Sequence, residues 1–188
     1  MMGRTHTAAG LLLVVTYCAF TALPFSGLVL LMAWLGSLAP DLDARDATIR
    51  HLSLRWGPGK RNRLPLIPLE ILGDLFHYFF GHRGVLHSLL AVILILIGGL
   101  FINVINGISG AWLLAFTLGY TSHLLLDALT PSGIPLWYPH QTTVSFLPRG
   151  LRIPTRSLGD IILFASCSLL LLSWFYFYPA LINQLLGN

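Results

Sequence analysis

The sequence predicts an all-α integral membrane protein: a helical bundle with about five transmembrane helices and one interfacial or re-entrant helix. First, hydrophobic residues make up 55% of its 188 residues and charged residues only 10%, against roughly 25% charged residues in soluble domains. Second, apolar runs of nearly membrane-spanning length recur along the chain. Third, polar segments rich in arginine separate some of these runs. This composition excludes a soluble monomer and an intrinsically disordered chain.

Two apolar runs come first, over about residues 7–23 and 25–39, and they end at Pro24 and Pro40. The second run, at about 15 residues, is short for a full span. Because Arg4 precedes the first run, a cleaved signal peptide is the alternative interpretation. No convincing small-x-small cleavage site follows, and the later spans need a first anchor, so we expect a retained helix.

Three later runs cover about residues 85–104, 109–129 and 158–178. The last of them ends in aromatic residues typical of the level at which helices leave a membrane: Trp174, Tyr176 and Tyr178. Together with the first two runs, they predict five spans in a single membrane domain over residues 1–188.

The segment between the second and third runs has a different character. Residues 44–63 hold five arginines and one lysine but a single acid, Asp46, and form a basic segment. Residues 64–81 are apolar but are interrupted by two prolines and three ionisable residues. This pattern predicts an interfacial or re-entrant helix rather than a span. A second polar, irregular loop with five prolines covers residues 131–157.

The arginines of segments 44–63 and 145–157 predict the orientation. Both segments fall on the cytoplasmic side of a five-span topology whose N-terminus is cytoplasmic, as the positive-inside rule requires. We therefore expect a multi-pass membrane protein. The same rule accounts for the net charge of +4, so no nucleic-acid partner is expected. Cys18 and Cys167 lie in apolar runs and are expected to pack there rather than form a disulfide.

Seven acidic residues accompany seven histidines, and half of these fourteen residues fall at the ends of four predicted spans on one membrane face. Four predicted spans deliver seven potential metal ligands to the cytoplasmic side: His6, Asp41, Asp43, His82, His87, His123 and Asp127. The predicted outer loops and tail contain no His, Asp or Glu. Ionisable groups at membrane depth normally pair, coordinate ions or mark a pathway. The placement therefore predicts a metal site.

Several parts of this set also have a simpler interpretation. His123 and Asp127 are four residues apart, so they share a helix face and can simply bond to each other. The segment from Asp41 to Asp43 follows a proline and can be a helix terminus with a turn. His6 can be an ordinary residue of the membrane interface.

The pair His82 and His87, with Arg83 between them, is harder to explain in that way. Such groups at the mouth of a span are costly without partners. The whole set combines imidazole nitrogen with carboxylate oxygen and has no thiolate, which favours zinc, with manganese as the alternative. Because a catalytic zinc takes about three protein ligands, seven candidates fit two neighbouring ions better than one.

Four blocks of residues resemble a known family. They are Thr5-His6-Thr7 with Gly10, Pro40-Asp41-Leu42-Asp43, His82-Arg83-Gly84-Val85-Leu86-His87-Ser88, and His123-Leu124-Leu125-Leu126-Asp127 before Thr130-Pro131. Together they resemble the YdjM-like family of inner-membrane, metal-dependent hydrolases, although Leu86 stands where a Thr is expected. The order of ligands is also similar to that of zinc-dependent phospholipase C and related single-strand nucleases. The resemblance implies a hydrolase embedded in a bacterial-type inner membrane, whose metal is held by these His and Asp residues.

The function expected from both arguments is hydrolysis of a phosphoester in a membrane lipid or lipid-linked substrate. The ligands would hold one or two ions that activate a water molecule as the nucleophile. Asp43 is the spare carboxylate, acting as a further ligand or as a base. Arg83 would bind the phosphate, or would instead be a positive-inside anchor. The basic segment 44–63 would attract anionic lipids, unless it serves topology alone.

Two other classes of function stay open. Intramembrane His and Asp residues also build metal-ion or proton transporters, although here they gather at one side and no second half repeats them. A structural membrane protein with paired polar residues is the third class. The sequence predicts no particular oligomeric state.

Overall fold

The computed structural model describes residues 1–21, 23–44, 47, 49, 53–55, 63–65, 67–81, 83–107 and 109–186. The elements follow in this order: α1 (Gly3–Phe20), α2 (Gly27–Leu38), the 3₁₀ helix η1 (Ala39–Asp43), β1 (Ser53–Arg55), β2 (Arg63–Pro65), α3 (Ile67–Phe80), the 3₁₀ helix η2 (Val85–His87), α4 (Leu89–Asn106), α5 (Gly110–Asp127), the 3₁₀ helix η3 (Arg149–Leu151), α6 (Leu158–Phe177) and α7 (Pro179–Leu186). Among the described residues, the secondary structure is thus all helical apart from one short antiparallel strand pair.

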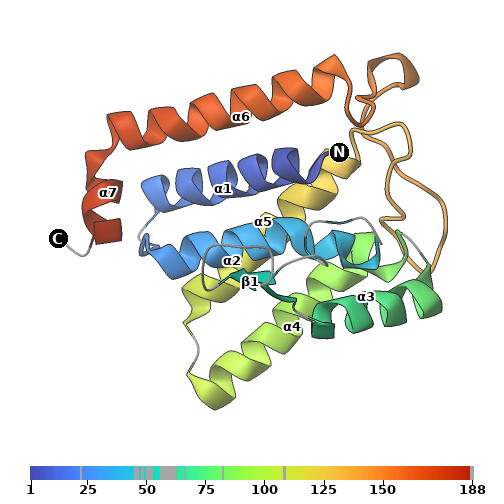
Figure 1. Cartoon of the computed structure of the whole chain (residues 1–188), viewed down its shortest axis with the longest axis horizontal. Helices are drawn as coiled ribbons and strands as arrows, with labels where there is room; N and C mark the ends of the chain where they lie inside the picture. Colours follow the sequence, from blue (N-terminus) through green and yellow to red (C-terminus); the bar gives the residue numbers. More distant parts are fainter. Residues whose placement is uncertain are drawn as a thin grey trace.

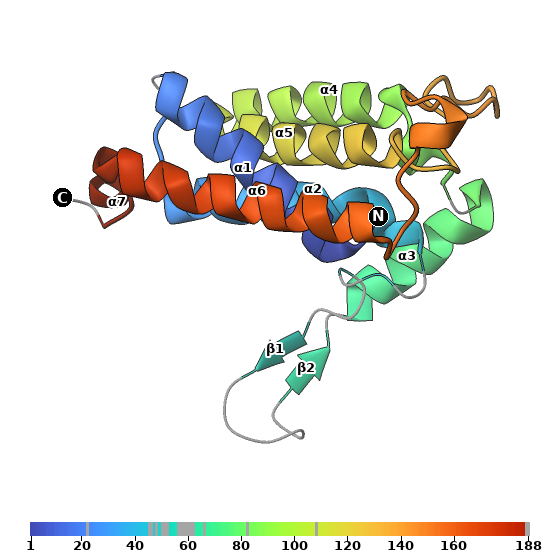
Figure 2. The same ribbon diagram turned by 90° about the horizontal axis from the view of Figure 1, so that it is seen from above.

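Four helices form the body of the bundle. Helix α1 packs against α2, α5 and α6, while α5 also packs against α2 and carries α4 on its outer side (Figures 1 and 2). The apolar centre of this bundle includes Val14 and Val15 of α1, Val29 of α2 and Ala115 of α5, all of them fully buried. This core aligns the ends of α1, α2 and α5 that carry the candidate ligands.

Glycines let α2 and α5 approach to backbone contact. A Cβ atom on Gly36 would lie 2.1 Å from the carbonyl oxygen of Phe116, and one on Gly119 would lie 2.2 Å from that of Ala33. Small residues at helix interfaces permit this close approach in membrane proteins. The contact holds the C-terminal end of α2, and η1 after it, beside the last turns of α5.

All five predicted spans are helical, and the predicted segment 64–81 contains α3. Among the described residues, α4 and α6 have both the length and the hydropathy of a membrane span. Helix α2 has 12 residues because Pro40 turns the chain into η1, and α5 carries several polar side chains. Helix α3, with 14 residues, extends about 21 Å and is too short to cross a hydrocarbon core of about 30 Å. The count of five spans stays a prediction.

The start of the third span and the C-terminal tail differ from the prediction. The third span begins at Leu89, not at residue 85, because Val85–His87 form a 3₁₀ turn and the Ser88 side chain caps α4 by accepting from the amide of Ala91. The expected C-terminal tail contains α7. The basic segment 44–63 lies largely outside the described residues, and its described part includes β1, which lies apart from the helical bundle with β2 (Figure 2).

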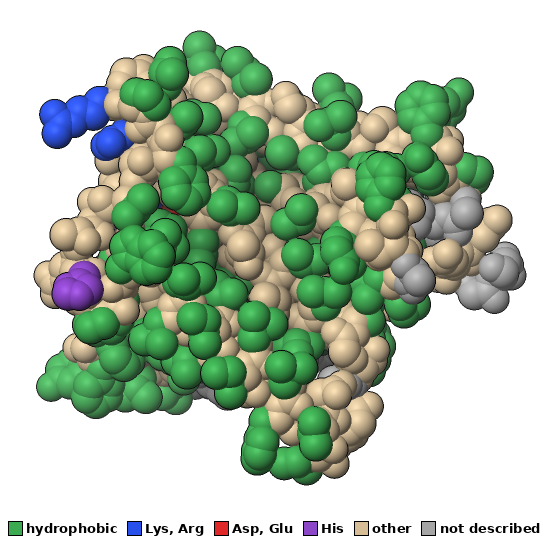
Figure 3. All heavy atoms as spheres, turned by 180° about the vertical axis from the view of Figure 1, so that it is seen from behind, with side chains coloured by type: hydrophobic (Ala, Val, Ile, Leu, Met, Phe, Trp, Pro, Cys, Tyr) green, Lys and Arg blue, Asp and Glu red, His purple; other side chains and the backbone are tan. Residues whose placement is uncertain are grey.

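Apolar side chains cover much of the outside of the bundle. On α4, Ile97, Leu100 and Phe101 are each more than half exposed, and on α6 the same holds for Ile162 and Leu169. Figure 3 shows one face on which hydrophobic side chains spread broadly, while the Arg and His side chains in view gather at one end. Exposed apolar surface on this scale suits contact with lipid rather than with water.

Candidate metal centre

Four short stretches of the fold carry predicted ligands to one end of the bundle. His6 lies in the first turns of α1, and Asp41 lies in η1 directly after α2. His87 ends η2 just before α4. His123 and Asp127 lie one turn apart at the end of α5, so their side chains share a face of that helix. Residues from distant parts of the sequence thus meet here.

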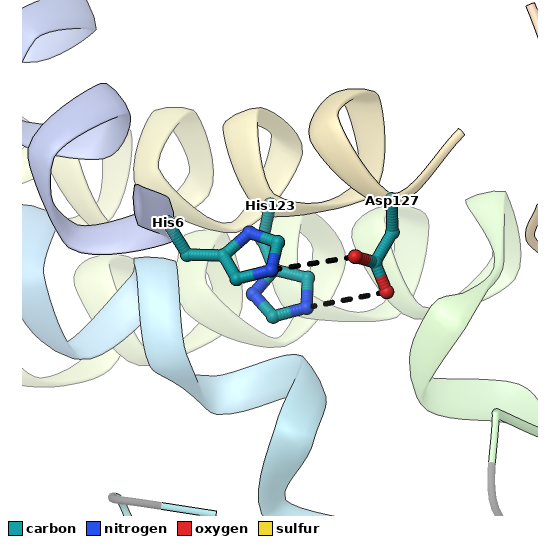
Figure 4. A group of neighbouring side chains, drawn as sticks. All are labelled: His6, His123 and Asp127. Atoms are coloured by element: carbon teal, nitrogen blue, oxygen red, sulfur yellow. Dashed lines mark ion pairs between the residues drawn. The ribbon is translucent and has the colours of Figure 1, made fainter. Parts of the chain in front are cut away.

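One group of ligand atoms comes from α1 and α5. In His6, His123 and Asp127, one ligand atom of each residue lies within 4.8 Å of the other two. The Nε2 atom of His6 is 3.3 Å from Oδ1 of Asp127, and the two imidazole rings stack with centroids 3.6 Å apart. Figure 4 shows both rings beside the Asp127 carboxylate. The backbone nitrogen of Met1 also donates to Oδ1 at 2.9 Å.

A second group overlaps the first at His123. Ligand atoms of Asp41, His87 and His123 lie within 4.8 Å of one another. Oδ1 of Asp41 is 3.6 Å from Nε2 of His87 and 3.5 Å from Nε2 of His123. The other carboxylate oxygen of Asp127, Oδ2, lies 3.7 Å from Nε2 of His87 and 3.9 Å from Nε2 of His123. Asp127 therefore faces both groups, one with each oxygen.

These separations suit ligands around a metal ion. Atoms bound tetrahedrally to zinc at about 2.0–2.2 Å lie roughly 3.3–3.6 Å from one another. The distances from Asp41 to His87 and His123 fall at this value, and those to Asp127 are slightly longer. Nitrogen and oxygen donors without sulfur are also a ligand set that zinc and manganese accept.

Several imidazole nitrogens of the site are buried without a hydrogen-bond partner, and a metal ion would supply a partner for them. Among the described residues, both ring nitrogens of His6 and Nε2 of His123 are buried without a hydrogen bond, which is unfavourable for polar atoms. Nδ1 of His123 lies 2.7 Å from the carbonyl oxygen of Ser37. Because a carbonyl can only accept, Nδ1 carries a proton, which leaves Nε2, on the side of Asp41, as the atom of this ring that a metal can bind. The residues present fit a divalent ion.

The protonation states of Asp41 and His87, the two ligands outside the spanning helices, also favour metal binding. Burial by itself would raise the pKa of the Asp41 carboxyl, but His123 and His87 beside it hold that pKa well below its usual range. Burial lowers the pKa of His87 against the opposing effect of Asp41. A carboxylate and a neutral imidazole are the forms that bind a metal.

Asp43 and Arg83 lie beside the ligand groups, and their predicted roles stay predictions. Asp43 is 1% exposed, belongs to neither ligand group, and accepts the backbone N–H of Arg83 on Oδ2 at 2.8 Å. The Arg83 guanidinium lies 3.0 Å from Oδ2 of Asp127 and donates to the hydroxyl of Ser132 and to the carbonyl of Gly133. His82, the remaining predicted ligand, lies outside the described residues.

Comparison with known proteins agrees with the sequence blocks that contain these residues. The family model of the YdjM inner membrane protein matches residues 1–182. The chain belongs to the YdjM inner membrane protein family. Membership supports an inner-membrane location, in agreement with the exposed apolar surface of α4 and α6.

The relatives of this YdjM-family chain match it to different extents. The inner membrane protein YdjM of Escherichia coli K12 is 48% identical over 62 residues, which are 32% of this chain and 31% of that protein, and the Shigella flexneri protein matches equally. The chain thus aligns with less than a third of these two relatives. The uncharacterized protein YvsG of Bacillus subtilis is 32% identical over 182 residues, 95% of each chain. No solved structure matches.

A cavity of about 640 Å³ opens beside the ligand groups of this YdjM-family protein. Asp41 and Asp127 line it, together with Arg83, which precedes η2, and with Thr155 and Arg156 of the loop before α6. The site is therefore accessible through a polar opening, while His6, His87 and His123 remain buried behind it. A ligand in this cavity would contact the carboxylates that face the metal position.

Sequence reasoning missed Asp160, which ties two parts of the site together. This carboxylate is fully buried and accepts from Thr5 Oγ1 at 2.7 Å, from the amide of Arg156 at 2.9 Å and from the amide of Met2 at 3.2 Å. It thereby joins α6 to the turn of α1 that carries His6. The signal in the sequence is Ser157-Leu-Gly-Asp160, in which Ser157 caps α6 and an acid follows three residues later.

Proposed function

We propose that this YdjM-family protein is a membrane-embedded, metal-dependent hydrolase that cleaves a phosphoester of a lipid or lipid-linked substrate. One observation carries the proposal: two overlapping groups of His and Asp ligand atoms share His123 and border a polar cavity. The burial of imidazole nitrogens without hydrogen bonds supports metal binding there. A purely structural cluster would be expected to satisfy those nitrogens within the protein.

In this proposal five residues hold one or two ions, most simply zinc: His6, Asp41, His87, His123 and Asp127. When bound, such an ion polarises the phosphoryl oxygen and lowers the pKa of a water molecule. In the hydrolysis, the water oxygen forms a bond to phosphorus, the ester P–O bond breaks, and the departing alcohol oxygen takes up a proton.

In this proposal, the protein's own residues bind the phosphate and fix its orientation. The Arg83 guanidinium lies 3.0 Å from Asp127 Oδ2, so a phosphate reaching the ligand groups would come within its range. Arginine suits this role because its planar donors match phosphate oxygens. Asp43 fixes the backbone of Arg83 through the 2.8 Å bond to its amide. We assign Asp43 a positioning role, in place of the ligand or base predicted from sequence.

Metal analysis of the purified protein tests the first part of the proposal. We expect the wild type in detergent to retain about one or two zinc ions per chain, and the H123A variant to lose nearly all of this metal, because both ligand groups lose a member. H140A is the matched control, since His140 is exposed and outside both groups. Equal metal content in wild type and H123A would refute the metal site.

Phosphate release from lipid extracts tests the second part. The wild type should release phosphate or a phosphorylated head group, chelation should abolish the release, and zinc should restore it. H123A should be inactive, and H140A should match the wild type. If the metal-loaded protein instead moves zinc across liposome membranes and hydrolyses none of these lipids, the transporter interpretation replaces the hydrolase.

A further inference from the structure

Two arginines beside the ligand groups share an uncommon backbone conformation. Among the described residues, Arg83 and Arg156 are the non-glycine residues with positive φ, at 59° and 62°. This left-handed conformation is unfavourable for residues that carry a Cβ atom. It persists where the surroundings impose it, and such residues concentrate at binding sites. Both arginines line the cavity that borders Asp41 and Asp127.

Each of these conformations is held by a buried carboxylate. Asp43, 1% exposed, accepts the amide of Arg83 at 2.8 Å. Asp160, fully buried, accepts the amide of Arg156 at 2.9 Å. The two segments are far apart in sequence, one before η2 and the other before α6. At both positions, a hydrogen bond from the arginine amide to a buried carboxylate places an arginine at this cavity.

The charges around the cavity are not balanced once the ligands bind a cation. The described residues that line it carry two acidic side chains, Asp41 and Asp127, and the two arginines, and the N-terminal amino group of Met1 lies 2.9 Å from Oδ1 of Asp127. Other described lining side chains, such as those of Leu38 and Ile49, are uncharged. A divalent ion would neutralise the two carboxylates. The arginines would then give the cavity a positive potential that an anion can satisfy.

The cavity is larger than one phosphate group requires. Its volume of about 640 Å³ lies within the range of roughly 300–1,000 Å³ typical of sites for small organic molecules. The side chain of Arg83 contacts Asp127 within the site, whereas that of Arg156 is exposed. An anion held at Arg83 next to the ligand groups therefore leaves Arg156 for a second negative group of the same molecule.

We propose that the cavity binds a head group with two neighbouring anionic groups, of which a diphosphate is the simplest, and that Arg156 recognises the second. This inference rests on the proposed function and specifies its substrate class. The reacting phosphate lies at Arg83 beside the ligand groups, and the outer phosphate lies at Arg156. Arg156 is then a specificity-determining residue that selects diphosphate over monophosphate.

Titration calorimetry with free anions tests this selection without any hydrolysis of lipid. The zinc-loaded protein in detergent is titrated with pyrophosphate and with orthophosphate. Its metal content is measured before and after, because pyrophosphate itself binds divalent ions. We expect the wild type to bind pyrophosphate at least about tenfold more tightly, since a charged hydrogen bond contributes about that much. R156Q should lose this preference while keeping its metal and its affinity for orthophosphate.

Two further variants sharpen the result. R156K keeps the charge and should restore part of the preference. R149Q removes an exposed arginine of the same loop that does not line the cavity, and it should behave as the wild type. The proposal is overturned if the wild type shows no preference for pyrophosphate, or if R156Q retains it.

A lipid arm separates a lipid head group from a free anion as the natural ligand. Farnesyl diphosphate and farnesyl phosphate are compared as substrates, and R156Q should raise KM about tenfold for the diphosphate alone. If pyrophosphate binding depends on Arg156 but neither lipid is hydrolysed, the anion site stands and the lipid hydrolase fails. If both lipids are hydrolysed in a metal-dependent way and R156Q changes nothing, the hydrolase stands and this inference fails.

Discussion

At the scale of single residues, His123 is the residue that both ligand groups share. Its one available nitrogen, Nε2, belongs to both ligand groups, while Nδ1 is bonded to the carbonyl of Ser37 at 2.7 Å. A ring oriented from one side in this way offers its other nitrogen in a fixed direction. Loss of this ring would therefore affect both groups at once, whereas loss of His6 or His87 would affect one.

A substitution of Asp43 distinguishes a positioning residue from a ligand. In D43A we expect full metal content, because Asp43 belongs to neither ligand group, but hydrolysis about ten- to a hundredfold slower. The reason is that the amide of Arg83 loses its acceptor, and misplacement of a binding group by about 1 Å costs up to about a hundredfold in rate. Metal analysis and phosphate release from the same preparation measure both.

Loss of metal in D43A would contradict a positioning role for Asp43. If D43A loses its metal as completely as H123A does, Asp43 is a ligand, as the sequence pattern first indicated. D127A serves as the reference for the loss of a carboxylate that faces both groups.

At the scale of helices, the site depends on the contact between α2 and α5. Asp41 follows α2 in η1, and His123 and Asp127 lie on α5, so the separation of these helices sets the separation of the ligands. Gly36 and Gly119 allow the helices to touch. A larger residue at either position must push the helices apart.

The variant G119A should therefore weaken both the fold and the site. Its Cβ would lie 2.2 Å from the carbonyl oxygen of Ala33, and overpacking of this kind typically costs about 1–3 kcal/mol. We expect a lower melting temperature by circular dichroism in detergent and a reduced zinc content.

Gly98 provides the matched control, since it lies within α4 and a Cβ there would meet no atom within 4 Å. G98A should be neutral or slightly stabilising, because alanine favours the helix over glycine. An unchanged melting temperature and zinc content in G119A would show that the helix contact is not what positions the ligands.

At the scale of the whole molecule, the charge pattern predicts how the bundle is oriented in the membrane. The loop that precedes α6, which carries Arg149, Arg152 and Arg156, lies at the same end of the bundle as the N-terminus (Figure 1). His6, in the first turns of α1, places the candidate metal centre at that end. If α1, α2, α4, α5 and α6 all cross the membrane, this end is cytoplasmic by the positive-inside rule. A substrate would then approach from the cytoplasmic leaflet.

Cysteine labelling in intact cells tests this topology. Cys18 and Cys167 are buried and are first replaced by alanine. In that background, R149C should be protected from a membrane-impermeant maleimide until the cells are lysed, because it lies before α6. N106C, at the opposite end of α4, should react with intact cells. The reverse pattern would place the candidate site outside the cytoplasm and contradict the predicted orientation.

Much of the fold could be predicted because the signals are local. Runs of apolar residues ended by Pro24 and Pro40 indicate where helices lie, and the start of α4 was misplaced by a few residues because the Ser88 cap competes with the apolar pattern of Val85 and its neighbours. The elements β1, β2 and α7 were not predicted. Nothing in the hydropathy pattern separates a short α7 from an irregular tail.

The membrane class follows from the sequence alone, because apolar residues dominate the composition along the whole chain. The candidate ligands could be picked out from the sequence because ionisable residues are rare in it. The tertiary structure decided how they are used. It joined His6, Asp41, His87, His123 and Asp127, directed Asp43 to the amide of Arg83, and brought Asp160 into contact with Thr5 and Arg156. These contacts depend on the distances between α1, α2, α5 and α6. The spacing of residues along a single helix does not determine those distances.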